Sequence, residues 1–473
     1  MLAMSLDKLS STDRAFLEIE DGAMGMHVGA TLVFEGGGLV RPDGGLDAER
    51  LTALIAAGID GVPRFRQCVR ELPGLGAAWV DDTHFRLDYH VKHTAVPRPG
   101  ALEQLMRLSG RVFAQHLDRQ RPLWELWLVE GLEGGRFAII VKAHHAMVDG
   151  VAGIGVLAAL FGVEPNEQEP PPSGWQPRPE PGTFELAKAL AASRAKGVLE
   201  MLHHARSSLD HRGEALSKAR DVASGLVETL REGLVPASAT ILNPPTLSPH
   251  RSFGGVRLDL RRVRDVKRLL GGTVNDVALT VVAGGLRAYL ARRGEPVDTL
   301  HDFRALVPVN LRTRPGHSDA ATGNHVSLLL ARLPVDEPDA RRRFEAVHEV
   351  CEHLKTESHE IEGAELIERI GDMGGPNVVA AVFKTAMRLR AFNVVVTNVP
   401  GPPFPLFLGT SKLEAMWGLV PLFAHQGLGV ALLSYMDGLF VGLHGDPDAV
   451  PELDVVGRDI TEAFEELAAL VGA

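Results

Sequence analysis

Hydrophobic residues alternate with polar ones, or run together over a few positions, in many short stretches of the chain. Such stretches predict β-strands, because successive side chains on a strand point to opposite faces. The predicted strands are residues 28–34, 126–129, 137–142, 303–309, 326–333, 394–399, 428–435 and 439–443. Glycine-containing turns, Glu133-Gly134-Gly135 and Asp437-Gly438, separate two of the neighbouring pairs. Each of these pairs is therefore expected to form a hairpin.

Elsewhere hydrophobic residues recur at every third or fourth position, which predicts helices. The predicted helices are residues 11–17, 102–116, 151–161, 183–235 in two or three segments, 273–293, 338–357, 376–390 and 456–471. Ser10 or Ser11 can cap the first helix. Thr273 and Asp276 stand in the positions of a capping box at the start of the helix that begins there.

Proline-rich segments interrupt this pattern near the middle of the chain. Residues 164–182 are rich in Pro, Glu and Gln, which is typical of an exposed linker, and Pro244-Pro245 marks a second break. Strands and helices alternate on both sides of this region. We therefore expect an α/β (α+β) fold with an N-terminal lobe at 1–163, a linker and helical crossover at 164–249, and a C-terminal lobe at 250–473.

Composition and charge limit the class of protein. A chain of 473 residues can bury a large core and form two domains. The net charge of −11 argues against a general nucleic-acid surface, so no nucleic-acid partner is expected. Cys68 and Cys351 are the only cysteines. Neither a disulfide framework nor a cysteine-rich zinc site is therefore expected, and a reducing cytoplasm fits.

The sequence predicts no membrane-spanning segment. The best apolar stretch, Val277–Leu290, is shorter than the roughly 20 residues that a span needs, and Arg287 interrupts it. The first residues lack a basic region followed by an apolar stretch, so no signal peptide is expected. We therefore expect a cytoplasmic protein, with a possible peripheral position at the inner membrane face or at lipid inclusions.

The stretch around two adjacent histidines carries the most specific candidate chemistry. A predicted strand ends in His144 and His145, and Asp149 and Gly150 follow after three residues. Neighbouring side chains on a strand face opposite ways, so one imidazole is expected to face a cavity while the other packs behind it. A neutral imidazole suits general-base catalysis near pH 7, Asp149 can fix the turn, and Gly150 leaves room for a ligand or a tight bend. By themselves these residues also allow a simpler interpretation, in which two histidines merely end a core strand.

The same residues resemble the HHxxxDG motif of the CoA-dependent acyltransferase superfamily. Further segments resemble one branch of it, the bacterial wax ester synthase/diacylglycerol acyltransferase family, in the family's order and over nearly the full length. These segments are Leu9–Leu17, Met26–Gly29, Pro122–Glu125, Asn275-Asp276, Pro308–Arg312, Gly323-Asn324 and Asn398–Pro402. The motif alone is moderately specific, and the ordered set is strong.

The resemblance implies a fold of two chloramphenicol-acetyltransferase-like lobes with a substrate tunnel between them. It implies an O-acyltransferase that moves a fatty acyl group from acyl-CoA to diacylglycerol or a long-chain alcohol without an acyl-enzyme. His145 would be the general base and His144 a supporting residue. Asp149 and Gly150 would be structural parts of the loop, and Asn275 would position substrate or stabilise the oxyanion. Acyl-CoA would be a co-substrate, with no permanently bound cofactor and no metal.

Coenzyme A carries phosphates, which need cationic partners. Basic residues cluster at 257–268 and 341–343 and at Lys384 and Arg388. Because such clusters are usually solvated surface, the sequence does not choose among them, and the cofactor-binding residues stay unknown.

Weak attachment to a membrane or to lipid inclusions is implied by relatives of the family. The segment 183–235 holds eight Lys/Arg and seven Asp/Glu, so it lacks the strong basic face of an amphipathic anchor. Packing across the two lobes is the preferred interpretation of this segment.

Other patterns imitate known sites but are weaker. Gly153-x-Gly155-x-x-Ala158 resembles a dinucleotide fingerprint, but two histidines and an aspartate separate it from the strand. The histidines within 203–211 lie on a polar predicted helix without a fourth ligand, so a solvated helix is preferred over a metal site. The chain has no G-x-S-x-G elbow, which argues against a serine acyl-enzyme.

Three alternative functions stay open. The chain could esterify a polyketide diol or a glycolipid hydroxyl, or it could use carrier-protein thioesters like a condensation enzyme. It could also be a non-catalytic lipid-binding or droplet-coating protein that keeps the fold. Acceptor profiling and turnover measurements would separate these functions.

Overall fold

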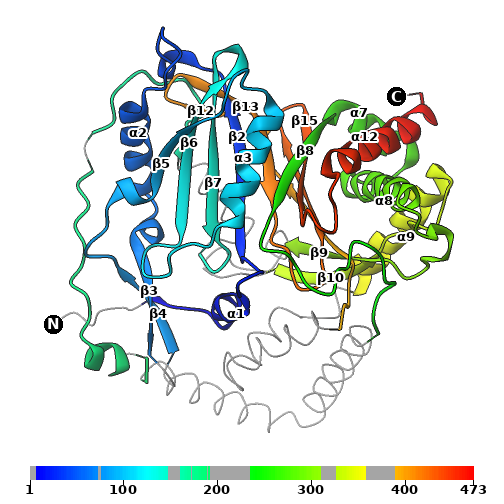
Figure 1. Cartoon of the computed structure of the whole chain (residues 1–473), viewed down its shortest axis with the longest axis horizontal. Helices are drawn as coiled ribbons and strands as arrows, with labels where there is room; N and C mark the ends of the chain where they lie inside the picture. Colours follow the sequence, from blue (N-terminus) through cyan, green and yellow to red (C-terminus); the bar gives the residue numbers. More distant parts are fainter. Residues whose placement is uncertain are drawn as a thin grey trace.

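The structure of the protein is a computed structural model, and it describes residues 7–72, 76–147, 160–171, 173–188, 190–191, 235–310, 326–357 and 389–472. Two six-stranded sheets with helices packed against them form two lobes that stand side by side (Figure 1). Two large hydrophobic cores hold most of the buried side chains. The predicted α/β fold with two lobes is confirmed.

The first sheet has the strand order β12-β13-β2-β7-β6-β5. Its strands are β2 (His27–Phe34), β5 (Val91–Ala95), β6 (Trp124–Leu132), β7 (Arg136–His144), β12 (Phe407–Leu408) and β13 (Ser411–Leu419). β6 and β7 form the hairpin predicted around the two glycines. β2 runs antiparallel to β7 over its whole length, with His27 opposite His144 and Phe34 opposite Phe137.

Strand β7 lies at the centre of the first lobe and is buried on both faces. This agrees with its nearly continuous apolar sequence, because a strand that is covered on both sides has no solvent-exposed face for polar side chains. Helix α3 (Leu102–Ala114) packs on one face, where the buried hydroxyl of Thr31 on β2 donates to Ser109 Oγ at 2.8 Å.

The second sheet has the strand order β10-β9-β11-β14-β15-β8. Its strands are β8 (Ser252–Asp259), β9 (Arg304–Asn310), β10 (Val326–Arg332), β11 (Val394–Pro400), β14 (Leu428–Tyr435) and β15 (Gly438–Gly445). β14 and β15 form the second predicted hairpin. Every residue of β15 is buried, so this strand is covered on both faces although it lies next to the edge strand β8.

The outer side of the second lobe is made of helices (Figure 1). They are α7 (Leu260–Leu270), α8 (Val274–Arg292), α9 (Ala340–Glu357) and α12 (Leu453–Ala469). The predicted capping box of α8 is confirmed. Thr273 Oγ1 accepts the N–H of Asp276 at 3.2 Å, and Asp276 Oδ2 accepts the N–H of Thr273 at 2.9 Å.

The two lobes are joined by close packing and by an exchanged strand pair. A Cβ atom added at Gly110 of α3 would lie 2.7 Å from the carbonyl oxygen of Arg251, just before β8. The absence of a side chain therefore lets the helix approach the second lobe. β12 and β13 come from the region predicted as the C-terminal lobe at 250–473, yet β13 pairs with β2 in the first sheet. The domain boundaries otherwise stay a prediction.

A smaller three-stranded sheet and two helices complete the first lobe. The sheet has the order β1-β4-β3. The elements are β1 (Asp7–Lys8), β3 (Gln67–Leu72), β4 (Gly76–Asp81), α1 (Ser11–Ile19) and α2 (Ala48–Asp60). Ser10 caps α1, because its Oγ accepts the N–H of Asp13 at 3.0 Å, which confirms the predicted start of this helix.

Some predicted elements fall largely outside the described residues. They are the helices at 151–161, 183–235 and 376–390. Within the part of the chain that is described, no single helix is long and apolar enough to cross a membrane. The pair α7 and α8 meets the length and composition test together, but the two helices meet at 102°.

Candidate active site

The chain turns where β7 ends at His144, and His145 is the first residue of the turn. Two backbone hydrogen bonds hold this point. The N–H of His144 donates to the carbonyl of Leu123 at 2.9 Å, and the N–H of His145 donates to the carbonyl of Met26 at 2.8 Å. Leu123 precedes β6 and Met26 precedes β2, the strands on either side of β7. The sheet therefore holds the two histidines in place.

His144 is buried, with 1% of its surface exposed. Its Nδ1 accepts the N–H of Ala146 at 3.0 Å. A ring nitrogen that accepts a hydrogen bond carries no proton, so the proton of the neutral ring is on Nε2. Nε2 lies 3.7 Å from Glu20 Oε2. Burial lowers the pKa of His144 to about 4, so this imidazole is neutral near pH 7 and supports the turn from behind.

His145 is more exposed than His144. Its ring stacks on the ring of Phe16 in α1, with centroids 4.2 Å apart and planes 30° apart. The ring is therefore supported on one face by a helix whose start Ser10 fixes. The expectation that one imidazole packs behind the other is confirmed for His144. The cavity in front of His145 stays a prediction, because residues 148–159 lie outside the described residues.

Asp149 and Gly150 belong to that undescribed stretch. Their structural role in the loop and the tunnel between the lobes therefore stay predictions. The same holds for other positions weighed in the sequence: Gly153, Gly155, Ala158, His203, His204, His211, Lys384 and Arg388.

The segment Pro122–Glu125 anchors the strands beside the histidines. Trp124 is buried and donates from Nε1 to the carbonyl of Phe65 at 2.7 Å. Glu125 Oε1 accepts from Lys92 at 2.8 Å, and Oε2 lies 3.6 Å from Nζ of the buried Lys142. Burial lowers the pKa of Lys142 to about 8. Two neighbouring lysines outweigh the effect of burial on Glu125 and lower the pKa of its carboxyl group.

Asn275, the second residue of α8, lies in the second lobe. Its Oδ1 accepts from Asn398 Nδ2 at 3.2 Å, and its Nδ2 contacts the sulfur of Cys351 at 3.7 Å. Two of the segments that resemble the family, Asn275-Asp276 and Asn398–Pro402, thus meet in space. The oxyanion or substrate-positioning role of Asn275 stays a prediction.

Asp276 is fully buried and serves the local structure, as expected. Besides closing the capping box, its Oδ2 lies 2.9 Å from His348 Nδ1 on α9. Asn275 therefore contacts both β11 and α9, and Asp276 contacts α9, so this pair of residues links two elements of the second lobe to the start of α8.

A carboxylate behind the histidines was not anticipated from the sequence. Glu20, the C-cap of α1, is almost completely buried and lies beside His144, His27, His116 and Arg119. His27 belongs to the family-resembling segment Met26–Gly29, so that match was the one signal available. Burial holds the pKa of His27 well below its ordinary value, which leaves its ring neutral.

Several of the basic residues considered for coenzyme A phosphates already have carboxylate partners. Arg262 pairs with Glu465 at 2.7 Å, and Arg268 pairs with Asp265 at 2.9 Å. Charges that are paired in this way favour the solvated-surface interpretation of these clusters.

Comparisons with known proteins agree with this architecture. Residues 9–278 match the family model described as the wax ester synthase/diacylglycerol acyltransferase catalytic domain. Residues 322–468 match the C-terminal domain of the same family.

Similar proteins span the whole chain. A Mycobacterium tuberculosis protein named as a probable diacylglycerol O-acyltransferase is 32% identical over 98% of this chain and 96% of its own length. The O-acyltransferase WSD of Acinetobacter baylyi is 28% identical over 97% of this chain and 96% of its own. The solved wax ester synthase/diacylglycerol acyltransferase of Marinobacter aquaeolei is 26% identical, with a TM-score of 0.72 over 99% of this chain and all of that one.

The first condensation domain of the CDA synthetase shares the fold, with a TM-score of 0.58 at 18% identity over all of this chain and 98% of that one. The match to the catalytic-domain model and the relatives that span the chain show that the protein is an acyltransferase. The chain belongs to the wax ester synthase/diacylglycerol acyltransferase family.

Proposed function

We propose that the protein transfers a fatty acyl group from acyl-CoA to the hydroxyl of diacylglycerol or of a long-chain alcohol, which yields triacylglycerol or a wax ester. The family and the names of relatives over the full length of the chain support this substrate class. The observation that carries the proposal is the position of His145. It begins the turn after the central strand and rests on Phe16, while its neighbour is packed away.

In the proposed reaction His145 acts as the general base. It takes the proton of the acceptor hydroxyl while the oxygen attacks the thioester carbonyl, and a tetrahedral oxyanion forms. Asn275 or a backbone N–H donates to this oxyanion. The carbon–sulfur bond then breaks, and the coenzyme A thiolate leaves and takes up the proton from His145. No acyl-enzyme and no permanently bound cofactor take part in this proposal.

The supporting residues would keep the base in one orientation. Nδ1 of His144 accepts a hydrogen bond from the N–H of Ala146. The ring therefore cannot rotate without breaking this bond. General-base catalysis typically contributes about 10²–10⁴ in rate, so the alignment of donor and acceptor has to supply much of the remainder. Asp149 and Gly150 would maintain the loop that follows.

We further propose a cytoplasmic location with weak peripheral contact at the inner membrane face or at lipid inclusions. The chain has only two cysteines, and both are buried, which suits a reducing compartment. Sedimentation with anionic phospholipid vesicles would test the contact, and a protein that stays entirely in the supernatant would contradict it.

The acceptor is tested by supplying palmitoyl-CoA with diacylglycerol and then with hexadecanol, and measuring the release of coenzyme A. Turnover with either acceptor supports the proposal. Turnover only with a polyketide diol or a glycolipid would show that the acceptor belongs to that class instead, and turnover with no acceptor would favour a lipid-binding protein.

Rapid quenching with labelled acyl-CoA should find no labelled protein, and a stoichiometric adduct would contradict direct transfer.

His145→Ala should lower kcat by about 10²-fold or more, because the base is removed, and should leave the melting temperature nearly unchanged. His93→Ala is a matched control on an exposed strand, where the imidazole lies 3.2 Å from Glu130. Near-normal turnover of His145→Ala would contradict the assignment of the base.

A further inference from the structure

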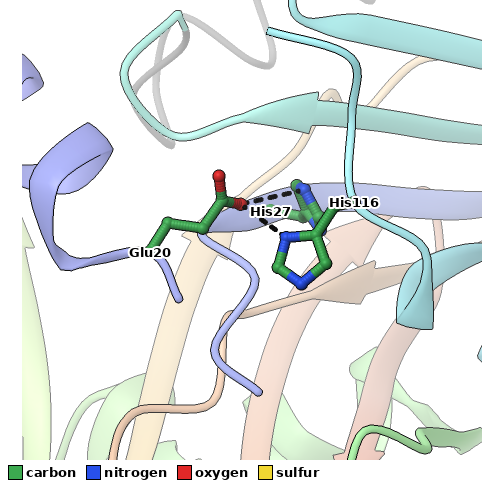
Figure 2. Close-up of side chains that lie close together, drawn as sticks. All are labelled: Glu20, His27 and His116. Atoms are coloured by element: carbon green, nitrogen blue, oxygen red, sulfur yellow. Dashed lines mark ion pairs between the residues drawn. The ribbon is translucent and has the colours of Figure 1, made fainter. Parts of the chain in front are cut away.

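Three potential metal ligands from separate segments converge behind the histidine pair. Glu20 Oε1 lies 3.3 Å from His27 Nε2 and 3.4 Å from His116 Nδ1. Figure 2 shows both imidazoles turned toward this same oxygen. All three atoms lie within 4.8 Å of one another. Glu20 caps α1, His27 begins β2, and His116 follows α3, so the cluster joins three elements of the first lobe.

His27 has polar atoms that hydrogen bonds do not satisfy. Its side chain is 3% exposed, and within the described residues neither ring nitrogen makes a well-aligned hydrogen bond. The backbone of Phe113 does approach the ring and raises its pKa, but burial outweighs this effect. The contact to Glu20 is short enough for a hydrogen bond but is not aligned as one. Leaving a buried donor or acceptor unpaired costs roughly 1–3 kcal/mol, so a ligand that engages this ring would be favoured.

The carboxylate is held so that one oxygen faces the two imidazoles. Arg119 donates from Nε and Nη2 to Glu20 Oε2, at 3.1 and 2.7 Å. Among the described residues, Oε1 accepts one backbone hydrogen bond, from the N–H of Met26 at 3.2 Å. A carboxylate oxygen has a second lone pair, which here is directed to the side of His27 and His116.

The separations match the coordination sphere of zinc. Zinc binds imidazole nitrogen and carboxylate oxygen at about 2.0–2.2 Å, and a tetrahedral arrangement then sets neighbouring ligand atoms about 3.3–3.5 Å apart. The two distances to Glu20 Oε1 agree with this spacing. The remaining nitrogen-to-nitrogen separation is at most 4.8 Å, and the His116 side chain is 40% exposed, so a modest rotation of this ring would bring its nitrogen to the tetrahedral spacing.

With three protein ligands, the fourth coordination position of a tetrahedral ion would be taken by a water molecule. His144 also lies next to Glu20, but its Nε2 carries the ring proton while Nδ1 accepts from Ala146, so it is not a ligand. His116 lines a surface groove of about 340 Å³ together with Gln115 and Leu117. His116 is therefore the member of the cluster that reaches the surface.

We propose that Glu20, His27 and His116 form a binding site for one divalent transition-metal ion, with zinc as the best match. Two imidazole ligands favour such ions over magnesium or calcium, which prefer oxygen. The ion would tie α1, β2 and the segment after α3 together beneath the turn, and it would take no part in the acyl transfer. This inference departs from the metal-free expectation drawn from the sequence.

The test is zinc binding by the full-length protein after treatment with a chelator, measured by competition with a chromophoric zinc indicator. One zinc per chain with a dissociation constant in the micromolar range or tighter is expected. His116→Ala should weaken this binding at least tenfold. His116 is the variant of choice because its side chain is partly exposed, whereas Glu20 and His27 are buried and their replacement could unfold the lobe.

His93→Ala is the matched control, since His93 is 42% exposed and also lies beside a glutamate. Its zinc affinity should equal that of the parent. X-ray absorption at the zinc edge should show imidazole nitrogen and oxygen at about 2.0–2.2 Å. Absence of micromolar binding in the parent, or equal affinity in His116→Ala and the parent, would overturn the proposal.

Discussion

Two adjacent residues with identical side chains have opposite environments in this protein. His144 is enclosed and accepts a hydrogen bond from the chain just after it, whereas His145 is partly exposed and stacks on Phe16. A strand sends neighbouring side chains to opposite faces, and this rule separates the two roles. The first imidazole accepts a hydrogen bond within the turn, and the second is the one that we propose as the base.

His144→Asn should preserve much of the activity that His144→Ala loses. The asparagine oxygen can take the place of Nδ1 and accept the N–H of Ala146, whereas alanine leaves that buried N–H unpaired at a cost of roughly 1–3 kcal/mol. We expect kcat of the alanine variant to fall by about tenfold or more, with a smaller loss for asparagine. The comparison requires kcat and KM for both variants. Equal losses would show that the acceptor at this position does not matter.

Acidification should destabilise the protein between about pH 6.5 and pH 4. The pKa of His144 is about 4 in the folded chain, against 6.5 without burial, and burial also lowers the pKa values of His27, His90 and His444. In this window the unfolded chain binds more protons than the folded one, so the unfolding free energy falls as the pH falls. The shifted pKa of His144 alone would lower the unfolding free energy by on the order of 3 kcal/mol across this window.

Urea unfolding at a series of pH values measures this effect. His144→Asn removes one of the titrating groups, so its stability should depend less steeply on pH than that of the parent. A parent stability that stays constant down to about pH 5 would contradict the neutral, buried state of these histidines.

Individual elements begin and end where local chemistry satisfies their free backbone groups. Helix α8 begins at a complete capping box, and α1 begins at a serine that accepts an N–H of its first turn. Such signals lie within a few residues of each other, so the sequence predicts them well. The dense charges of 257–268 obscure the periodicity of helix α7, which was not predicted. Helix α2 and the strands β1, β3, β4, β5, β8, β12 and β13 were also not predicted.

Thr273→Ala should lower the unfolding free energy by about 1 kcal/mol, because it removes the acceptor for the N–H of Asp276. Thr273→Ser keeps the hydroxyl and should be nearly neutral. Urea unfolding of both variants is the measurement. A serine variant as unstable as the alanine variant would show that the cap is not the cause.

The arrangement of the lobes depends on contacts between distant segments. Helix α3 of the first lobe approaches β8 of the second at Gly110, and β13 crosses into the first sheet beside β2. Another close approach lies between the layers, where a Cβ atom at Gly442 would meet the carbonyl oxygen of Gly418 at 2.1 Å. These contacts set the relation between the turn that carries His145 and the lobe that carries Asn275.

Gly110→Ala should destabilise the protein by about 1–3 kcal/mol, since the new methyl group would overlap the backbone at Arg251 and press the lobes apart. Gly22→Ala is the control, because no atom lies within 4 Å of a Cβ added there. Thermal unfolding measures stability, and turnover reports any change in the relation of the lobes. Equal melting temperatures for Gly110→Ala and the parent would contradict this close packing.

The sequence alone determined most strands and helices, both hairpins, the capping box and the family, because each depends on neighbours along the chain or on the order of short motifs. It did not determine which histidine is enclosed, the placement of β13 in the first sheet, or the meeting of Asn275 with Asn398. Apart from the family match of the segment that holds His27, it carried no sign that Glu20, His27 and His116 converge. These features depend on side chains far apart along the chain, whose approach is decided only when the sheets and helices pack.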